Sequence, residues 1–435
     1  MGAEASVIQK DFDRIAGEEA VDFDDEIWGR ICDGEIEMPR KNVKDWLERT
    51  AASWTMRQFS ENRNSGNYWQ LLRHLIHMLA LCTSGNHKMV SEKDVQRALN
   101  LVVMVRYTIK THVQELTPES LLELYGSHVP AWHKETSRTE SLLQAFCDAV
   151  ALLLMSQVRE AHTYYTYSLH FECAGLLLEM SATQMTQALG APCNPFLDHL
   201  MSRREYARPF MFAMFKTWIE QQAAPVAPAI KPYNLFGSVS LSSTSKHPPW
   251  QIPLLLADSR QPPLSQLSEK CSLLILIFVN FSHPTLENPF RAELQQMHDS
   301  DPELVEEGRG ESSHVMLLSH DDQCVHVPFS KLHDAFAKTL VDDRTVLLFY
   351  YTIYHNHRFL NYVLAKSEPQ RVTRIEKRLD TDGCDRLSLY PCSNLRTRQE
   401  TKPPNCNYML LVIFLILSND AIYSSNIHSP DCMMV

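Results

Sequence analysis

Three close pairs in the sequence have side chains of the kinds that bind metals: His74 with His77, Cys324 with His326, and His355 with His357. Imidazole and thiolate groups at such spacings can hold Zn²⁺, which needs three or four protein ligands. None of these pairs is followed by a second pair at the spacing of a zinc-binding motif. The sequence therefore favours polar or half-buried histidines over a metal site.

The short motifs of common enzyme classes are missing from this sequence. It has no GxxxxGK[ST] phosphate loop, no GxGxxG, no GxSxG and no HExxH. Residues 380–383 (DTDG) start like a calcium-binding loop, but the glutamate that would complete the loop is absent. A site around Asp342, His355 and His357 remains as an enzyme hypothesis, although no partnered nucleophile or base accompanies these residues. We therefore predict a protein that is not an enzyme, with no cofactor, no metal and no small-molecule substrate.

The first six residues, MGAEAS, match an N-myristoylation signal. Removal of Met1 exposes the amine of Gly2, and Ser6 supplies the hydroxyl that the pattern requires. One acyl chain gives only weak, reversible membrane binding, with an association constant of about 10⁴ M⁻¹. The residues that follow are acidic, whereas the usual second signal is a basic patch. We predict an acylated N-terminal tail over residues 1–22 whose membrane contact needs a partner or an oligomer.

The composition describes a folded, helix-rich chain. Of its 435 residues, 44% are hydrophobic and only 13 are glycine, which favours helices over strands. The net charge of −11 argues against a nucleic-acid-binding protein, which needs a clustered basic face. Several of the 11 cysteines lie in apolar helical segments, where thiols are usually buried, and reduced thiols indicate a cytoplasmic setting. Apolar runs at 271–281 and 408–417 are about half of the roughly 20 residues that a membrane-spanning helix needs. Both are therefore predicted to be buried helices.

Apolar residues recur at helical spacing through most of the chain, and Ser91 with Asp94 and Thr117 with Pro118 mark helix starts. Short helices of this kind must stack on neighbours to bury their apolar faces. We predict an all-α fold, an irregular armadillo- or HEAT-like α-solenoid of stacked helix pairs that is incomplete at its C-terminus. Its predicted parts after the tail are a helical array over 23–220, a Pro/Ser-rich linker over 221–270, a second part of the array over 271–366, a disordered insert over 367–407, and an isolated apolar helix with a tail over 408–435.

Residues 341–366 are predicted to form two helices joined by the polar corner His355-Asn356-His357. The apolar stripe predicted for the first helix is Val346, Leu347, Tyr350, Tyr351 and Tyr354. Asp342, Asp343 and Thr345 are expected to accept free backbone N–H groups at the start of this helix, and Ser330 is expected to cap the helix that precedes it.

Several stretches, in this order, resemble the dymeclin family. They are MGAEAS at the N-terminus, DEIW at 25–28, a leucine-rich helix at 273–280 followed by NPFR at 288–291, LLFYYTIYHNHRFLNYVLAK at 347–366, and YMLLVIFLILSND at 408–420. Residues 367–407 are polar and basic and fit neither a helix nor the family. Against this family the chain therefore looks truncated, with an anomalous insert near 367–407.

The resemblance implies a non-catalytic peripheral protein of the Golgi, needed for Golgi organisation and vesicle trafficking. It implies a cytoplasmic location on the Golgi membrane, weakly anchored by a myristoyl group on Gly2. The partners expected are that membrane and trafficking proteins, with no nucleic acid. The alternative is a soluble helical-repeat adaptor or regulatory subunit without a lipid anchor.

Overall fold

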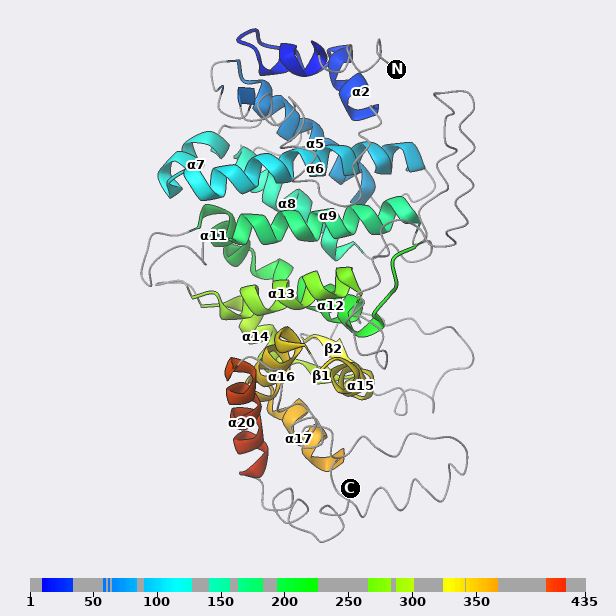
Figure 1. Ribbon diagram of the computed structural model, residues 1–435, viewed down its shortest axis with the longest axis vertical. Helices are drawn as coiled ribbons and strands as arrows, with labels where there is room; N and C mark the ends of the chain where they lie inside the picture. The colour runs from blue at the N-terminus through cyan, green and yellow to red at the C-terminus, as the bar shows by residue number, and fades with distance from the viewer. Residues whose placement is uncertain are drawn as a thin grey trace. The chain divides into compact units, whose positions relative to one another are not determined.

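A computed structural model of the chain describes residues 10–33, 58–59, 62, 65–83, 90–126, 141–156, 163–182, 194–225, 265–282, 287–300, 324–340, 342–366 and 404–419 (Figure 1). These residues are mostly helical, which confirms the all-α prediction. The strands found among them are one parallel pair of two residues each, β1 (His298–Asp299) and β2 (His326–Val327). The chain divides into two compact units, residues 1–200 with 223–263 and residues 201–222 with 264–435.

Helix pairs stack in the first unit. Its described helices are α2 (Glu26–Asp33), α5 (Asn67–Thr83), α6 (Glu92–Glu115), α7 (Pro118–Tyr125), α8 (Leu142–Met155), α9 (Tyr164–Ser181) and most of α11 (Pro195–Ser202). The pair α5–α6 lies against the pair α8–α9, with α6 on α9 and α5 on α8 (Figure 1). This is the stacking expected of paired helices, while a superhelix running through the whole chain stays a prediction.

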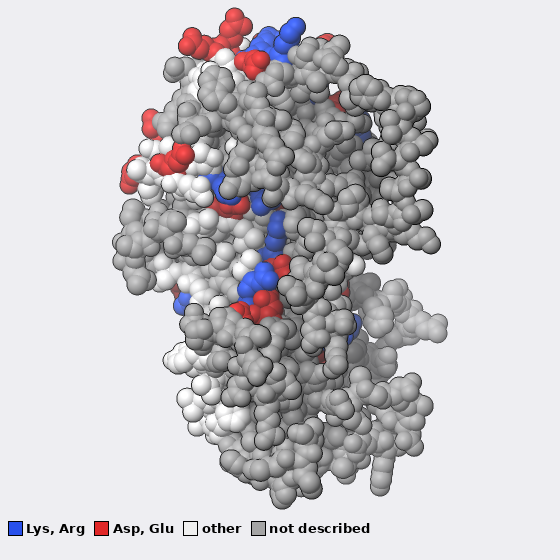
Figure 2. Space-filling model, viewed as in Figure 1, with Lys and Arg blue, Asp and Glu red and all other residues white. Residues whose placement is uncertain are grey.

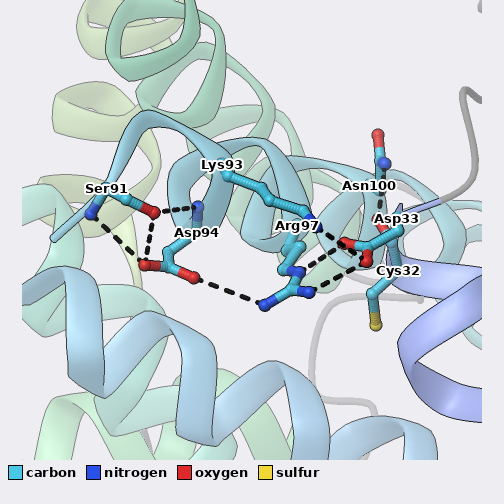
Figure 3. A network of polar contacts seen from close by, with 7 residues as sticks. All are labelled: Cys32, Asp33, Ser91, Lys93, Asp94, Arg97 and Asn100. Carbon is cyan, nitrogen blue, oxygen red and sulfur yellow. Dashed lines mark hydrogen bonds and ion pairs between the residues drawn. The ribbon is translucent and has the colours of Figure 1, made fainter. Parts of the chain in front are cut away.

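The start of α6 holds the end of α2 through a polar network (Figure 3). Ser91 and Asp94 form the predicted capping box, in which each side chain accepts a hydrogen bond from the other residue's backbone N–H. One turn further on, Arg97 binds both carboxylate oxygens of Asp33, and Lys93 lies 3.1 Å from the same group. A carboxylate at the C-terminus of α2 is repelled by the negative end of the helix dipole. The two cations compensate for this repulsion and hold the pKa of Asp33 at about 2.

The residues just before α2 also belong to the packed first unit. Residues 10–16 are helical, and Asp11 forms two hydrogen bonds of 2.8 Å with Arg30. The buried amide of Asn67 accepts from Val21 N at 2.7 Å and donates to Ile15 O at 2.9 Å. From residue 10 onward, the predicted N-terminal tail (1–22) is instead part of the packed first unit. Local periodicity could not reveal this, because the contacts join residues that are far apart in the sequence. Gly2 lies outside the described residues.

The second unit contains α12 (Arg204–Glu220), α13 (Gln266–Asn280), α14 (Pro289–Gln296), α15 (Phe329–Thr339), α16 (Asp343–His355), α17 (His357–Lys366) and α20 (Pro404–Ser418). Helix α12 packs against α13 and α14, and α16 packs against α13, α17 and α20. Its aromatic core includes Trp218 against Phe336 and Phe210 stacked on Phe278, with ring centroids 4.6 and 4.8 Å apart.

Two predicted boundaries in this unit differ from the structure, and the last predicted helix is not isolated. Helix α13 begins at Gln266, inside the predicted linker 221–270, and α20 begins at Pro404, inside the predicted insert 367–407. Residues 226–264 and 367–403 lie outside the described residues. Helix α20 is not isolated, because it contacts α16 and buries Leu410, Ile413 and Leu417.

The tripeptide Asn-Pro-Phe begins two short helices, α11 after Asn194 and α14 after Asn288. In both, the asparagine side-chain oxygen accepts a backbone N–H from the first turn, at 3.2 Å in α11 and 2.9 Å in α14. The side-chain amide donates at 2.7 Å to a carbonyl near the end of the preceding helix, Met180 O or Phe278 O. Proline takes a position that needs no N–H donor, and the phenylalanine is buried. One amide therefore joins two helix ends, which gives NPFR a structural role.

Candidate functional site

The first histidine pair is a packing feature and shows no metal-site geometry. The His74 ring is stacked on Phe23 with centroids 3.9 Å apart, and its Nε2 lies 3.0 Å from Phe23 O. Burial lowers the pKa of His74 to about 4, so the ring is neutral at neutral pH. His77, three residues on, is exposed.

The second pair lies at the start of β2. Cys324 Sγ is 4.0 Å from Gln296 Oε1, and the His326 ring lies 5.6 Å from that of His298 on β1. Within the described ranges, no three His, Cys, Asp or Glu side chains gather in a way that could hold a metal ion. A search of the same residues finds no helix whose length and apolar character would let it cross a membrane.

The third pair flanks a corner that is built on Asn356. The two predicted helices, α16 and α17, are confirmed, and the side chain of Asn356 between them is 0% exposed. Its oxygen accepts from Phe359 N at 2.7 Å, and its amide donates to Leu294 O and Met297 O, both at 2.8 Å. Asn356 therefore caps α17 and also fixes the end of α14.

The predicted cap of α15 is wrong, whereas Asp342 does take the N-cap position of α16 but without the expected hydrogen bond. Phe329 N donates to Asp299 Oδ1 at 2.8 Å, so a residue of β1, not Ser330, caps α15. Asp342 makes no side-chain cap and instead accepts from Arg344 Nε at 2.9 Å. Asp299 takes the N–H at the start of α15, and Arg344 takes the carboxylate that was expected to cap α16.

The geometry does not assemble the enzyme site considered around Asp342, His355 and His357. Asp342 precedes the first turn of α16 and His355 ends the helix, which puts their backbones about 20 Å apart. His355 is half-buried and stacked on Tyr351, and burial and the charge of Arg291 lower its pKa. His357 is exposed at the start of α17. These groups cannot act together on one substrate.

The tyrosines of α16 do not form its buried stripe, which corrects the prediction. Of the predicted stripe only Val346 is buried, and the buried side of the helix continues through Phe349, Thr352 and Ile353. Tyr354 is 55% exposed, and its ring stacks on that of Tyr350 at 5.5 Å. A tyrosine tolerates this position because its hydroxyl can stay in water while its ring covers the helix.

Helix α20 continues this aromatic surface. Helix α20 packs against α16. Burial raises the pKa of Tyr350, and the neighbouring hydroxyls of Tyr354, Tyr351 and Tyr408 raise it further. Along α20, the exposed side chains are Tyr408 (67%), Leu411 (61%) and Leu415 (70%). Figure 2 shows the surface over α20 as white, with no described Lys, Arg, Asp or Glu on it. We call this surface the α16–α20 face: Tyr350, Tyr351, Tyr354, Tyr408, Leu411 and Leu415.

The described residues define an all-α protein of packed helix pairs. The sequence model of the family described as "Dymeclin: Dyggve-Melchior-Clausen syndrome protein" matches residues 1–434, and the chain belongs to this family.

Known relatives agree with this assignment. The chain is 22% identical over 412 residues to Dymeclin of Dictyostelium discoideum, covering 85% of this chain and 41% of the relative. It is 21% identical over 454 residues to Dymeclin of Xenopus laevis, covering 98% of this chain and 62% of the relative. The chain thus spans less than two thirds of the length of these curated relatives. No solved structure matches it.

Proposed function

We propose that this chain is a non-catalytic helical scaffold at the cytoplasmic face of the Golgi. Its role is in Golgi organisation and vesicle trafficking, and a myristoyl group on Gly2 anchors it weakly to the membrane. The observation that carries the proposal is the family match over residues 1–434 together with the MGAEAS start.

The state of the cysteines supports a reducing compartment. Among the described residues, Cys32, Cys82, Cys147 and Cys271 are buried thiols outside any disulfide. Burial raises the pKa of Cys32 and of Cys271 to about 12, so both stay protonated. They act as small hydrophobic core residues, which suits a protein of the cytoplasm.

The anchor can be tested by replacing the acylated residue alone. The variant Gly2→Ala removes the acceptor amine of the myristoyl transfer, and Ala3→Gly is a matched control that leaves Gly2 in place. With an association constant of about 10⁴ M⁻¹, half of the wild-type chain should float with uncharged vesicles at about 0.1 mM accessible lipid. The Gly2→Ala chain should stay in solution, and its Golgi association in cells should be lost.

Unchanged flotation and unchanged Golgi association of Gly2→Ala would rule out the anchor. An acetylated or unmodified N-terminus on the wild-type chain would favour the alternative, a soluble helical-repeat adaptor or regulatory subunit. The acidic residues after the signal are the observation that speaks for this alternative, because they repel anionic lipid.

A further inference from the structure

A short stretch of chain joins Gly2 to the packed first unit. The segment 10–33 is held on this unit by the buried amide of Asn67, which donates to Glu19 O at 2.8 Å. Only residues 3–9 lie between Gly2 and this segment. A chain of this length reaches at most about 28 Å, and a flexible coil of the same length averages about 16 Å end to end. An acyl chain on Gly2 therefore brings residues 10–33 close to the membrane that it enters.

Acidic side chains outnumber basic ones in this segment. Residues 10–33 contain nine acidic and three basic side chains. The packing neutralises some of them, since Asp11 binds Arg30 and Asp25 lies 3.2 Å from Arg14. The exposed carboxylates that form no ion pair with the described residues are Glu18, Glu19, Asp22 and Asp24, and we call them the acidic rim. The fold thus leaves a negative surface beside the tethered end.

Hydrogen bonds to buried side chains fix the backbone of the acidic rim. Val21 N donates to the side-chain oxygen of Asn67 at 2.7 Å, and Asp22 O accepts the indole N–H of Trp28 at 3.0 Å. Trp28 is itself buried in the core of the first unit. The rim is therefore part of the folded unit and stays in place when the acyl chain enters a membrane.

We propose that the anchored end of this chain selects membrane surfaces of low negative charge. The inference rests on the proposed myristoyl anchor on Gly2 and names the kind of lipid surface that the anchor takes. A leaflet rich in anionic lipid has a surface potential of roughly −30 to −50 mV, which repels carboxylates within about a Debye length. A basic protein segment is the other class of partner that a carboxylate surface attracts. The acylation signal, at most about 28 Å away, favours the membrane.

The expected selectivity follows from the tether length. Glu4 is two residues from the acyl site, so it lies within about 7 Å of it and experiences most of the surface potential. At about 0.05 M salt the Debye length is about 14 Å, so carboxylates about 16 Å from the surface experience roughly a third of the potential. Three such groups together count as about one full charge, which is worth roughly three- to sevenfold in binding at these potentials. The rim and Glu4 together should give a preference for uncharged lipid on the order of tenfold.

The test uses the acylated full chain at about 0.05 M salt. Flotation compares vesicles of phosphatidylcholine alone with vesicles in which phosphatidylserine replaces part of it. The variant Glu18→Gln/Glu19→Gln/Asp22→Asn should lower the preference for uncharged vesicles about fivefold and leave binding to them unchanged. The matched control Glu115→Gln/Glu119→Gln/Glu123→Gln removes the same charge from exposed residues outside the tethered segment, and it should change the preference less than about twofold.

The outcomes separate this inference from the anchor itself. A wild-type chain that floats with neither kind of vesicle would refute the anchor and this inference together. Equal flotation with both kinds, or stronger flotation with phosphatidylserine, would overturn the charge selectivity and leave the anchor standing. An unchanged preference in the rim variant, with circular dichroism showing the helical fold intact, would also overturn it.

Discussion

Replacing Asn356 by alanine should destabilise the second unit more than a substitution of this size usually does. The side chain is fully buried between α16 and α17. It makes one hydrogen bond to Phe359 N and two to the carbonyls of Leu294 and Met297. Alanine removes all three bonds and leaves two carbonyls and one N–H in the interior without this partner.

The magnitude follows from these groups. Loss of an N-cap costs about 1 kcal/mol. Each buried carbonyl that loses its partner adds about 1–3 kcal/mol, less whatever water can enter to replace it. We expect the free energy of unfolding of the second unit to fall by about 3 kcal/mol.

Hydrogen exchange measured on peptides from α14, α16 and α17 is the suitable assay, because it reports the second unit separately from the first. Asn361→Ala is the matched control, since Asn361 is an exposed asparagine on α17. The control should change stability by less than about 0.5 kcal/mol. If Asn356→Ala and Asn361→Ala gave the same exchange protection, the structural role assigned to Asn356 would be wrong.

Two further predictions concern pH and the first unit. His74 has a pKa of about 4 when folded against 6.5 for the free side chain, so acid favours the unfolded chain; stability should fall between pH 6.5 and 4. In urea titrations at several pH values, His74→Gln should reduce this fall by about 1–2 kcal/mol, and an identical pH profile would refute the assignment. Hydrogen bonds from Arg97, then from Lys93, lower the pKa of Asp33 to about 2 from 3.8, so its stabilisation is present above pH 3.8 and is lost as pH falls through 2. Asp33→Asn should therefore lower stability by less than about 1 kcal/mol at pH 7, because the pair is partly exposed, with the difference from wild type disappearing in acid melts.

The helices were predictable because their signals are local. Apolar spacing and the capping box of Ser91 depend on residues within one or two turns. The buried side of α16 was not predictable in this way, since Tyr350 and Tyr354 share the same helical spacing as Phe349 and Ile353. The buried side of α16 is the one that includes Thr352. Its hydroxyl can be buried because it donates to Leu348 O of the same helix and so needs no water.

The corner at residues 355–357 was predicted, but the long-range hydrogen bonds of its asparagine and of Asn288 were missed for a different reason. Asn288 and Asn356 hold carbonyls that belong to other helices, up to 62 residues away in the sequence. The repeated signal, Asn-Pro-Phe, is only three residues long, so it does not stand out as a repeat. Asp299 likewise caps α15 from 30 residues away. Such sites are formed by contacts between distant segments, and these contacts cannot be predicted from hydrophobic periodicity.

The central claim is that a helical scaffold is anchored through its own N-terminus. The most direct test is intact-mass spectrometry of the N-terminal peptide from chain isolated from cells, together with flotation of the same preparation. We expect a peptide that lacks Met1 and carries one myristoyl group on Gly2, found mainly in the membrane fraction. A wholly unmodified or acetylated N-terminus in membrane-bound chain would contradict it.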